Sequence, residues 1–307
     1  MPCWLDRHNR RTVWVGAAVA RLEELVPYGG HKNKEVWTTY LPHAIYVAGT
    51  HGIVDEAASV ELLDRVGRCQ ASLGQYSAAE KTHRQALLVR AQVLEPEHPD
   101  TLTSMNNVAL ALSGQGKYAK AEKMHRKTLE LREKVLGDEH SRTLISVNEV
   151  GLALSDQGEH AEAEKMHRKA LELSKKVLGE QHPHTLTSMN NVAQAFSGQG
   201  EYVEAEKMHR ETLELSKEVK GDKHPHTLTS MYCLAHVLAK QLRYDDSGNL
   251  YEQACAAYDT VLGKEHPTTR ACHQHHRQML ALQEQGQTLF KPEGNEDVRT
   301  SKRRRLM

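Results

Sequence analysis

The chain has 307 residues, of which 39% are hydrophobic and 5% aromatic, so burial has to rest on Ala, Leu, Val and Met. Basic and acidic residues are equal at 40 each, which argues against a general nucleic-acid or membrane binder, since either would carry a basic excess. Five scattered cysteines without a CxxC pair indicate unpaired thiols in a reducing compartment. With no signal peptide or 18-residue apolar run, a cytoplasmic protein is expected.

The first 55 residues predict a helical N-terminal region. Apolar residues recur at helical spacing from Val13 to Leu25 and again from Val36 to Val47, and a Pro-Tyr-Gly-Gly break separates the two runs. Neither run shares the phase of the sequence that follows, so this region is expected to be distinct from it.

Residues 56–285 consist of a 42-residue sequence repeat. Direct comparison of residues 98–139 with 182–223 gives 30 identical positions of 42. Glycine, alanine and histidine recur at fixed offsets, as at Gly116, Ala121 and His125. Repeats begin at about residues 56, 98, 140, 182 and 224, and a closing helix follows near 268–284. The first and fifth repeats depart from the pattern, as is expected of capping repeats that meet solvent. In the fifth, Leu242 replaces the glycine and Ser247 replaces the alanine.

Each repeat predicts two helices. The first begins at His-Pro, where proline suits the first helical position because its missing N–H has no helical partner there. The second runs from about Tyr118 to Leu136, with Gly137 as a left-handed cap. Its predicted buried stripe comprises Ala121, Met124, Thr128, Leu131 and Val135, three or four residues apart. No helix buries such a stripe alone, so the repeats must stack.

Three signatures carry a family resemblance: Asn-Asn-Val-Ala, Gly-x-Tyr-x-x-Ala-Glu and Leu-Gly-x-x-His-Pro-x-Thr-Leu. The chain resembles tetratricopeptide repeat (TPR) proteins of the 42-residue kinesin-light-chain type, and the C-terminal arrays of fungal STAND/NB-ARC proteins. Residues 37–44 resemble the linker helices that precede those arrays. The resemblance implies an all-α fold, a right-handed superhelical solenoid of antiparallel helix pairs with about five repeats and a capping helix.

The resemblance also implies a peptide- or protein-binding groove on the first helices, where the second, fifth, sixth and ninth positions face the ligand. Transferred to this sequence, the predicted groove residues are Arg65, Arg68, Asn106, Asn107, Asn148, Glu149, Asn190, Asn191 and Gln194. Asparagine is a mediocre helix former, so its repeated use in mid-helix needs a reason. Its carboxamide can grip the backbone of an extended peptide. Equally, it can bond neighbouring helices and hold the repeat geometry.

No enzymatic site is expected. Nine of the 20 histidines recur with the repeat, which favours packing and turn geometry over chemistry. The cluster from Cys272 to His276 has no second ligand pair at zinc spacing, so a surface-exposed terminal helix is favoured over a metal or thiol site, and no metal or other cofactor is predicted. No GxxxxGK[ST] loop occurs, so no bound nucleotide is expected either.

The leading functional prediction is therefore a protein-binding scaffold that resembles the sensor region of STAND-type receptors. A kinesin-light-chain-like cargo adaptor is the alternative, although residues 1–50 lack sustained heptads. A metal-dependent or thiol enzyme ranks third. No nucleic-acid or membrane partner is expected. Residues 286–307 predict a disordered basic tail, in which Lys302-Arg303-Arg304-Arg305 also fits a short nuclear import signal. The chain could be a truncated product, a fragment of a longer gene or a stand-alone repeat protein.

Overall fold

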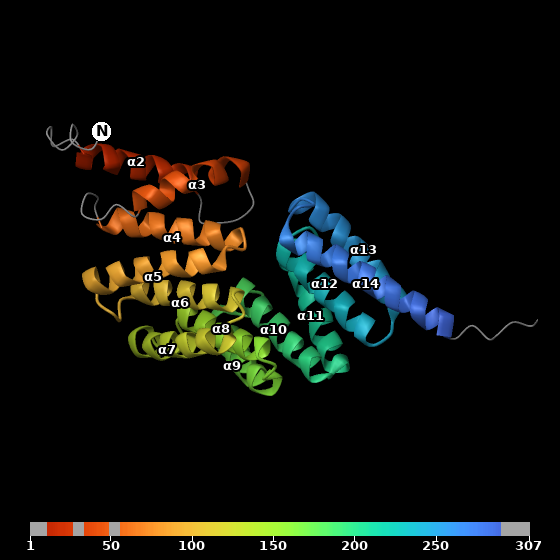
Figure 1. Ribbon diagram of the computed structural model, residues 1–307. Helices are drawn as coiled ribbons and strands as arrows, with labels where there is room; N and C mark the ends of the chain where they lie inside the picture. Colours follow the sequence, from red (N-terminus) through yellow and green to blue (C-terminus); the bar gives the residue numbers. More distant parts are fainter. Residues whose placement is uncertain (1–10, 27–33, 49–55, 290–307) are drawn as a thin grey trace, which may run out of the picture. The chain divides into compact units, whose positions relative to one another are not determined.

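A computed structural model describes residues 11–26, 34–48 and 56–289. Within them the chain forms thirteen helices and no strand (Figure 1). The helices are α2 (Arg11–Leu25), α3 (Lys34–Ala48), α4 (Glu56–Ser72), α5 (Tyr76–Val93), α6 (Pro99–Gly114), α7 (Tyr118–Leu136), α8 (Ser141–Asp156), α9 (His160–Leu178), α10 (Pro183–Gln199), α11 (Tyr202–Lys220), α12 (Pro225–Lys240), α13 (Tyr244–Val261) and α14 (Pro267–Leu289).

The chain divides into two compact units, residues 1–219 and 220–307. The N-terminal unit holds α2 and α3 followed by four helix pairs, and the C-terminal unit holds one pair and α14. The predicted all-α solenoid of helix pairs is confirmed. The Pro-Tyr-Gly-Gly break and residues 290–307, with the basic cluster, lie outside the described residues. Helix α14 extends to Leu289, past residue 286, where the tail was expected to begin.

The recurring histidines at the start of each repeat cap the first helices. The imidazole Nδ1 of His98 accepts a hydrogen bond from the backbone N–H of Asp100 at 3.2 Å. The same bond, from the residue two positions later, recurs at His140, His182, His224 and His266. Such a cap satisfies one of the N–H groups that a helix start leaves without a helical partner. Turn geometry therefore explains these five residues, as the sequence indicated.

The core of the N-terminal unit is shared between consecutive helices. One cluster joins Leu129 of α7 with Val147 and Val150 of α8 and with Ala163 and Ala170 of α9. Because each repeat completes the core of its neighbour, the stacking follows from the sequence pattern.

The predicted stripe of α7 needs two corrections. Val135 is 40% exposed, whereas His125, Leu129 and Arg132 are buried. The second helix packs against first helices on two sides, so its buried face is wider than one stripe. The cap Gly137 has a positive φ of 84° but a ψ of 164°, which is extended and not left-handed helical.

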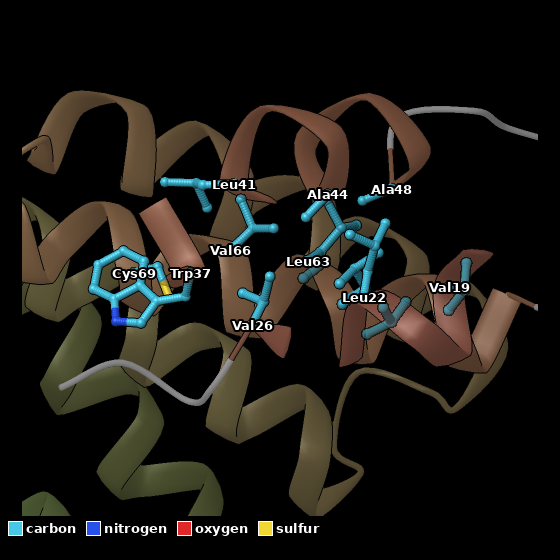
Figure 2. Packing of buried hydrophobic residues seen from close by; sticks show 13 residues of the cluster. Val19, Leu22, Val26, Trp37, Leu41, Ala44, Ala48, Leu63, Val66 and Cys69 are labelled. Atoms are coloured by element: carbon cyan, nitrogen blue, oxygen red, sulfur yellow. The ribbon is translucent and has the colours of Figure 1, made fainter. Parts of the chain in front are cut away.

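Helices α2 and α3 cover the first helix of repeat 1. Figure 2 shows side chains of all three helices gathered in one cluster, including Leu22, Trp37, Leu41, Leu63 and Val66. The apolar face that α4 would otherwise present is thus buried by the N-terminal region. Among the described residues, none of the helices combines the length and apolar character needed to cross a bilayer.

The loop inside repeat 5 contains a strained residue. Leu242 has a φ of 63°, at the position where the other repeats have a glycine, as in Gly158 with a φ of 84°. A side chain makes this backbone region unfavourable by about 1 kcal/mol. Leu242 is 71% exposed, so little packing offsets that cost.

Leu242→Gly is therefore expected to raise the free energy of unfolding by about 1 kcal/mol, because it relieves this strain. Urea denaturation followed by circular dichroism measures it. Leu242→Ala keeps a Cβ at the same φ and serves as the control, with little change expected. A glycine variant no more stable than the alanine variant would contradict the assignment of strain.

Candidate functional site

The first helices of repeats 2, 3 and 4 each expose one residue in their central stretch. In residues 101–112 of α6 it is Leu110, in 143–154 of α8 it is Leu152, and in 185–196 of α10 it is Gln194. The leucines are 43% and 39% exposed, although the residues around them are buried or half-buried. Counted from Leu102, Leu144 and Leu186 as first positions, the three residues occupy the ninth position of their first helices, so they form a row at the 42-residue spacing.

Two further positions share this side of each helix. Residues three and seven positions before the ninth lie on the same helical face, and they are the sixth and second positions. We call this set the first-helix face; it comprises Thr103, Asn107 and Leu110 of α6, Ile145, Glu149 and Leu152 of α8, and Thr187, Asn191 and Gln194 of α10. The second-position residues were not singled out from the sequence, although their offset from the ninth position would have identified them.

The asparagines at the fifth position point into their own repeats. The Oδ1 atoms of Asn106, Asn148 and Asn190 each lie 3.1 Å from Nδ1 of a histidine on the following second helix. Those histidines are His125, His167 and His209, all 1% exposed. Because an amide oxygen only accepts, the Nδ1–H tautomer of each imidazole is the donor.

The imidazoles of His125 and His167 are kept neutral by their surroundings. Burial lowers the pKa of His125 and of His167 to about 4, and the charge of Arg132 adds to the effect at His125. The ring of His167 packs so closely on Gly151 that a Cβ there would meet it at 2.5 Å. Packing and hydrogen bonding within the repeat therefore account for this second recurring histidine.

The sixth position connects consecutive repeats. The amide Nδ2 of Asn191 donates to Oδ1 of Asn148 at 3.4 Å, and Nδ2 of Asn107 approaches Oδ1 of Asp64 at 3.5 Å. Asn148 in turn donates to Oγ of Ser188 at 2.8 Å. The fifth and sixth positions thus form polar contacts, here called the polar ladder, between repeats 1 and 2 and between repeats 3 and 4. Of the two roles that the sequence left open for the asparagines, these contacts describe the one that holds repeat geometry.

Repeat 1 replaces the asparagine by a buried charge. Oδ2 of Asp64 lies 2.5 Å from Nη1 of Arg90, and Oδ1 lies 3.5 Å from Nδ1 of His83. Burial raises the pKa of Asp64, but the His83 hydrogen bond and the Arg90 charge outweigh it and hold the pKa below its usual value. Beside it, Arg65 donates to the backbone carbonyls of Glu23 and Val26 at the end of α2.

Repeat 3 has Glu149 where its neighbours have Asn107 and Asn191. Burial raises the pKa of this carboxyl group to about 7, against the opposing effect of the Arg132 charge. Arg132 is 4% exposed and donates to Oγ of Ser146 at 2.7 Å. The first-helix face thus carries a carboxyl group that titrates near neutral pH.

In the C-terminal unit, aromatic and sulfur groups replace the polar ladder. The hydroxyl of Tyr232 lies 2.5 Å from Nδ1 of His275, at the same fifth-to-sixth offset. Cys272, expected on an exposed helix, is fully buried, and its Sγ lies 2.8 Å from Sγ of Cys255. It is buried because α14 packs against α13. Within the described residues, no group of three or more His, Cys, Asp and Glu side chains is arranged to hold a metal ion.

Known proteins match this arrangement at the level of the repeat. A family model described as tetratricopeptide repeat matches residues 57–134, 142–218 and 198–260. A nucleotide-binding leucine-rich repeat (NLR)-like protein of Hyaloscypha variabilis is 40% identical over 105 residues, which are 34% of this chain. The match spans only 11% of that relative's length.

Two solved structures share the fold. A Podosopora anserina protein described as a kinesin light chain with nearly identical TPR-like repeats gives a TM-score of 0.56 at 23% identity, covering 67% of this chain and 97% of that one. NprR in complex with its cognate peptide NprX gives a TM-score of 0.59 at 12% identity, covering 93% of this chain and 73% of that one. At these identities the likeness concerns the fold alone.

Proposed function

The chain belongs to the tetratricopeptide repeat family, and we propose that it binds an extended segment of a partner protein along the first-helix face. The observation that carries the proposal is the row of Leu110, Leu152 and Gln194, each the exposed residue in the otherwise covered central stretch of its helix. Isolated exposed leucines need no explanation, but a row at one register on consecutive helices is typical of a binding surface. The fold is one that commonly serves as a non-catalytic scaffold.

The chemistry of the row favours a ligand with mixed side chains. Leu110 and Leu152 offer apolar contacts, Gln194 offers both a donor and an acceptor, and Glu149 adds a carboxyl group. Packed helices lie roughly 8–10 Å apart, and an extended chain advances about 3.3 Å per residue. About every third ligand residue would therefore meet a new helix, so the differences between repeats would select the ligand sequence.

The remaining residues singled out from the sequence support this face in different ways. Arg68, half-buried at the ninth position of α4, continues the row and selects ligand side chains together with Glu149 and Gln194. Arg65 holds the end of α2. The asparagines at positions 106, 107, 148, 190 and 191 fix the register of the helices, and the half-buried Asn148, Asn190 and Asn191 also border the ligand backbone. Neither a nucleotide nor a nucleic acid is part of the proposed site.

Substituting the row tests the proposal. Leu110→Glu/Leu152→Glu is expected to weaken the affinity for a partner recovered by pull-down at least about tenfold. Binding would then have to remove water from two carboxylates at positions where the leucines made apolar contacts. Val203→Glu, at a 72% exposed site on the second helix α11, is the matched control and should bind as the parent does. Calorimetric titration measures both. Unchanged binding by the double variant, shown to be folded, would move the site off the first-helix face.

We also propose that the array serves as the sensor region of an NLR-like receptor. The 40% identity to the Hyaloscypha variabilis protein supports this context over that of a cargo adaptor. Genomic sequence upstream of Met1 tests it, because a phosphate loop in the same reading frame is expected. A heptad-repeat region there would instead favour the kinesin-light-chain-like alternative.

A further inference from the structure

A second surface lies on the other side of the N-terminal unit, between the second helices α5 and α7. It is a groove of about 520 Å³ whose floor is apolar, formed by Leu87, Met105, Leu112 and Met124. Met105 and Leu112 are seven residues apart on one side of α6, whereas Leu110 precedes Leu112 by two residues, about 200° around the helix. The groove is therefore separate from the first-helix face.

Four cations surround this floor, and no acidic residue lines the groove. They are Arg84 of α5 and Lys120, Lys123 and Lys127 of α7. Arg84 pairs with Glu80 at 2.9 Å. The three lysines are exposed, and no acidic group of the described ranges lies within ion-pair distance of them. The groove thus combines an apolar floor with unneutralised positive charge.

The equivalent surface between α7 and α9, which we call the second groove, is an internal comparison, defined by the residues 42 positions after those of the first groove. Its floor is equally apolar, with Leu129, Val147, Leu154 and Met166 at the corresponding positions. Its rim differs, because Glu133, Asp138 and Glu162 stand where the first groove has Ala91, Pro96 and Lys120. Three acids there balance three cations, which are Arg126, Lys165 and Lys169.

An ion pair crosses this second groove. Nζ of Lys169 lies 3.0 Å from Oε1 of Glu133, so that α9 is joined to α7. In the first groove the corresponding residues are Lys127 and Ala91, and no such pair can form. Three acids also balance three cations at the equivalent positions of α9 and α11, where Glu180, Glu204 and Glu211 accompany Arg168, Lys175 and Lys207. Excess positive charge is therefore particular to the groove between α5 and α7.

We propose that the groove between α5 and α7 binds an acidic linear segment of a partner protein that carries large apolar side chains. The apolar side chains occupy the floor, and flanking carboxylates meet Lys120, Lys123 and Lys127. Charge complementarity selects this occupant, since like charge would be repelled and a purely apolar segment would leave the lysines unused. The site goes beyond the proposed first-helix face and does not depend on it.

A synthetic probe tests the proposal on the full chain. The probe is a fluorescein-labelled peptide of sequence Glu-Asp-Leu-Glu-Asp-Phe-Glu-Asp-Leu, and its binding is measured by fluorescence polarisation. The salt concentration is about 0.1 M, at which charges still interact over about 10 Å. We expect one site per chain. A peptide with serine in place of its three apolar residues should bind at least about tenfold more weakly, because it loses the contacts with the floor.

Exchanging residues between the two grooves supplies the matched variants. Ala91→Glu/Lys120→Glu copies the second groove into the first and should weaken binding at least about tenfold, since it restores a partner for Lys127 and removes a rim cation. Lys165→Glu/Val203→Glu makes the same change in net charge elsewhere on the second helices and should bind as the parent does. Glu133→Ala/Glu162→Lys opens the second groove and should raise the stoichiometry from one to two.

Four results would overturn the proposal. Parental affinity in folded Ala91→Glu/Lys120→Glu would remove the groove from consideration. Equal binding of the serine peptide would show that the interaction is unspecific electrostatic attraction. Binding of the protein to vesicles of phosphatidylserine and phosphatidylcholine as strongly as to the peptide would show the same. Loss of probe binding in Leu110→Glu/Leu152→Glu would assign the probe to the first-helix face. Retained binding in that variant supports the groove whatever the fate of the proposed function.

Discussion

Replacing Asn106, Asn148 and Asn190 together by alanine is expected to lower the free energy of unfolding by roughly 3–9 kcal/mol. Each substitution removes the acceptor of a nearly inaccessible imidazole N–H and leaves that donor without a partner. An unsatisfied buried donor costs about 1–3 kcal/mol. The Asn148 change also removes the bonds to Ser188 and Asn191. Chemical denaturation followed by circular dichroism measures the loss.

A thermodynamic cycle separates the hydrogen bond from general damage. Asn148→Ala, His167→Ala and the double variant should show a coupling energy of at least about 0.5 kcal/mol, because the pair is in direct contact. Gln194→Ala, at an exposed position of α10, is the control and should change stability little. If the triple variant has the same free energy of unfolding as the parent, the asparagines do not hold the repeats together, and their amides would be available to a ligand backbone.

Glu149→Gln is expected to stabilise the protein at pH 8 by about 1–3 kcal/mol. The pKa of Glu149 is raised from 4.5 to about 7 in the folded state because the carboxyl group is buried. The stability that its protonated form contributes is complete below pH 4.5 and is lost as the pH rises through about 7. The range allows for solvent near this half-buried group, which weakens the penalty.

Urea denaturation of parent and variant at several pH values between 4.5 and 8 tests this expectation. The difference between the two should be small at pH 4.5 and should grow toward pH 8. The same comparison with Glu172→Gln, at an exposed position on α9, should show no such growth. A difference for Glu149→Gln that is the same at every pH would contradict a neutral carboxyl group in the folded protein.

The sequence by itself determined the repeat and its helices. Helix starts and ends followed from the 42-residue spacing, from prolines such as Pro99 and from glycines such as Gly116 and Gly137, as α6 and α7 show. These features act through local backbone geometry, so they need no knowledge of the neighbours. The structural interpretation of the recurring histidines was correct for the same reason, because duplication copies what every repeat requires.

The direction of individual side chains on a helix was decided only by tertiary structure. The repeat pattern placed Asn106 on the first helix, but the contact with His125 depends on how α7 packs against α6. The burial of Cys272 likewise depends on the packing of α14 against α13.

The basic groove depends on tertiary structure for the same reason. Ala91 and Lys127 are 36 positions apart, and only the stacking of α5 beside α7 brings them to the same groove. They are equivalent to Glu133 and Lys169, which form an ion pair, whereas alanine offers Lys127 no carboxylate. Helical periodicity fixes which residues share a face, whereas the charge and burial of that face are set by the neighbour that packs on it.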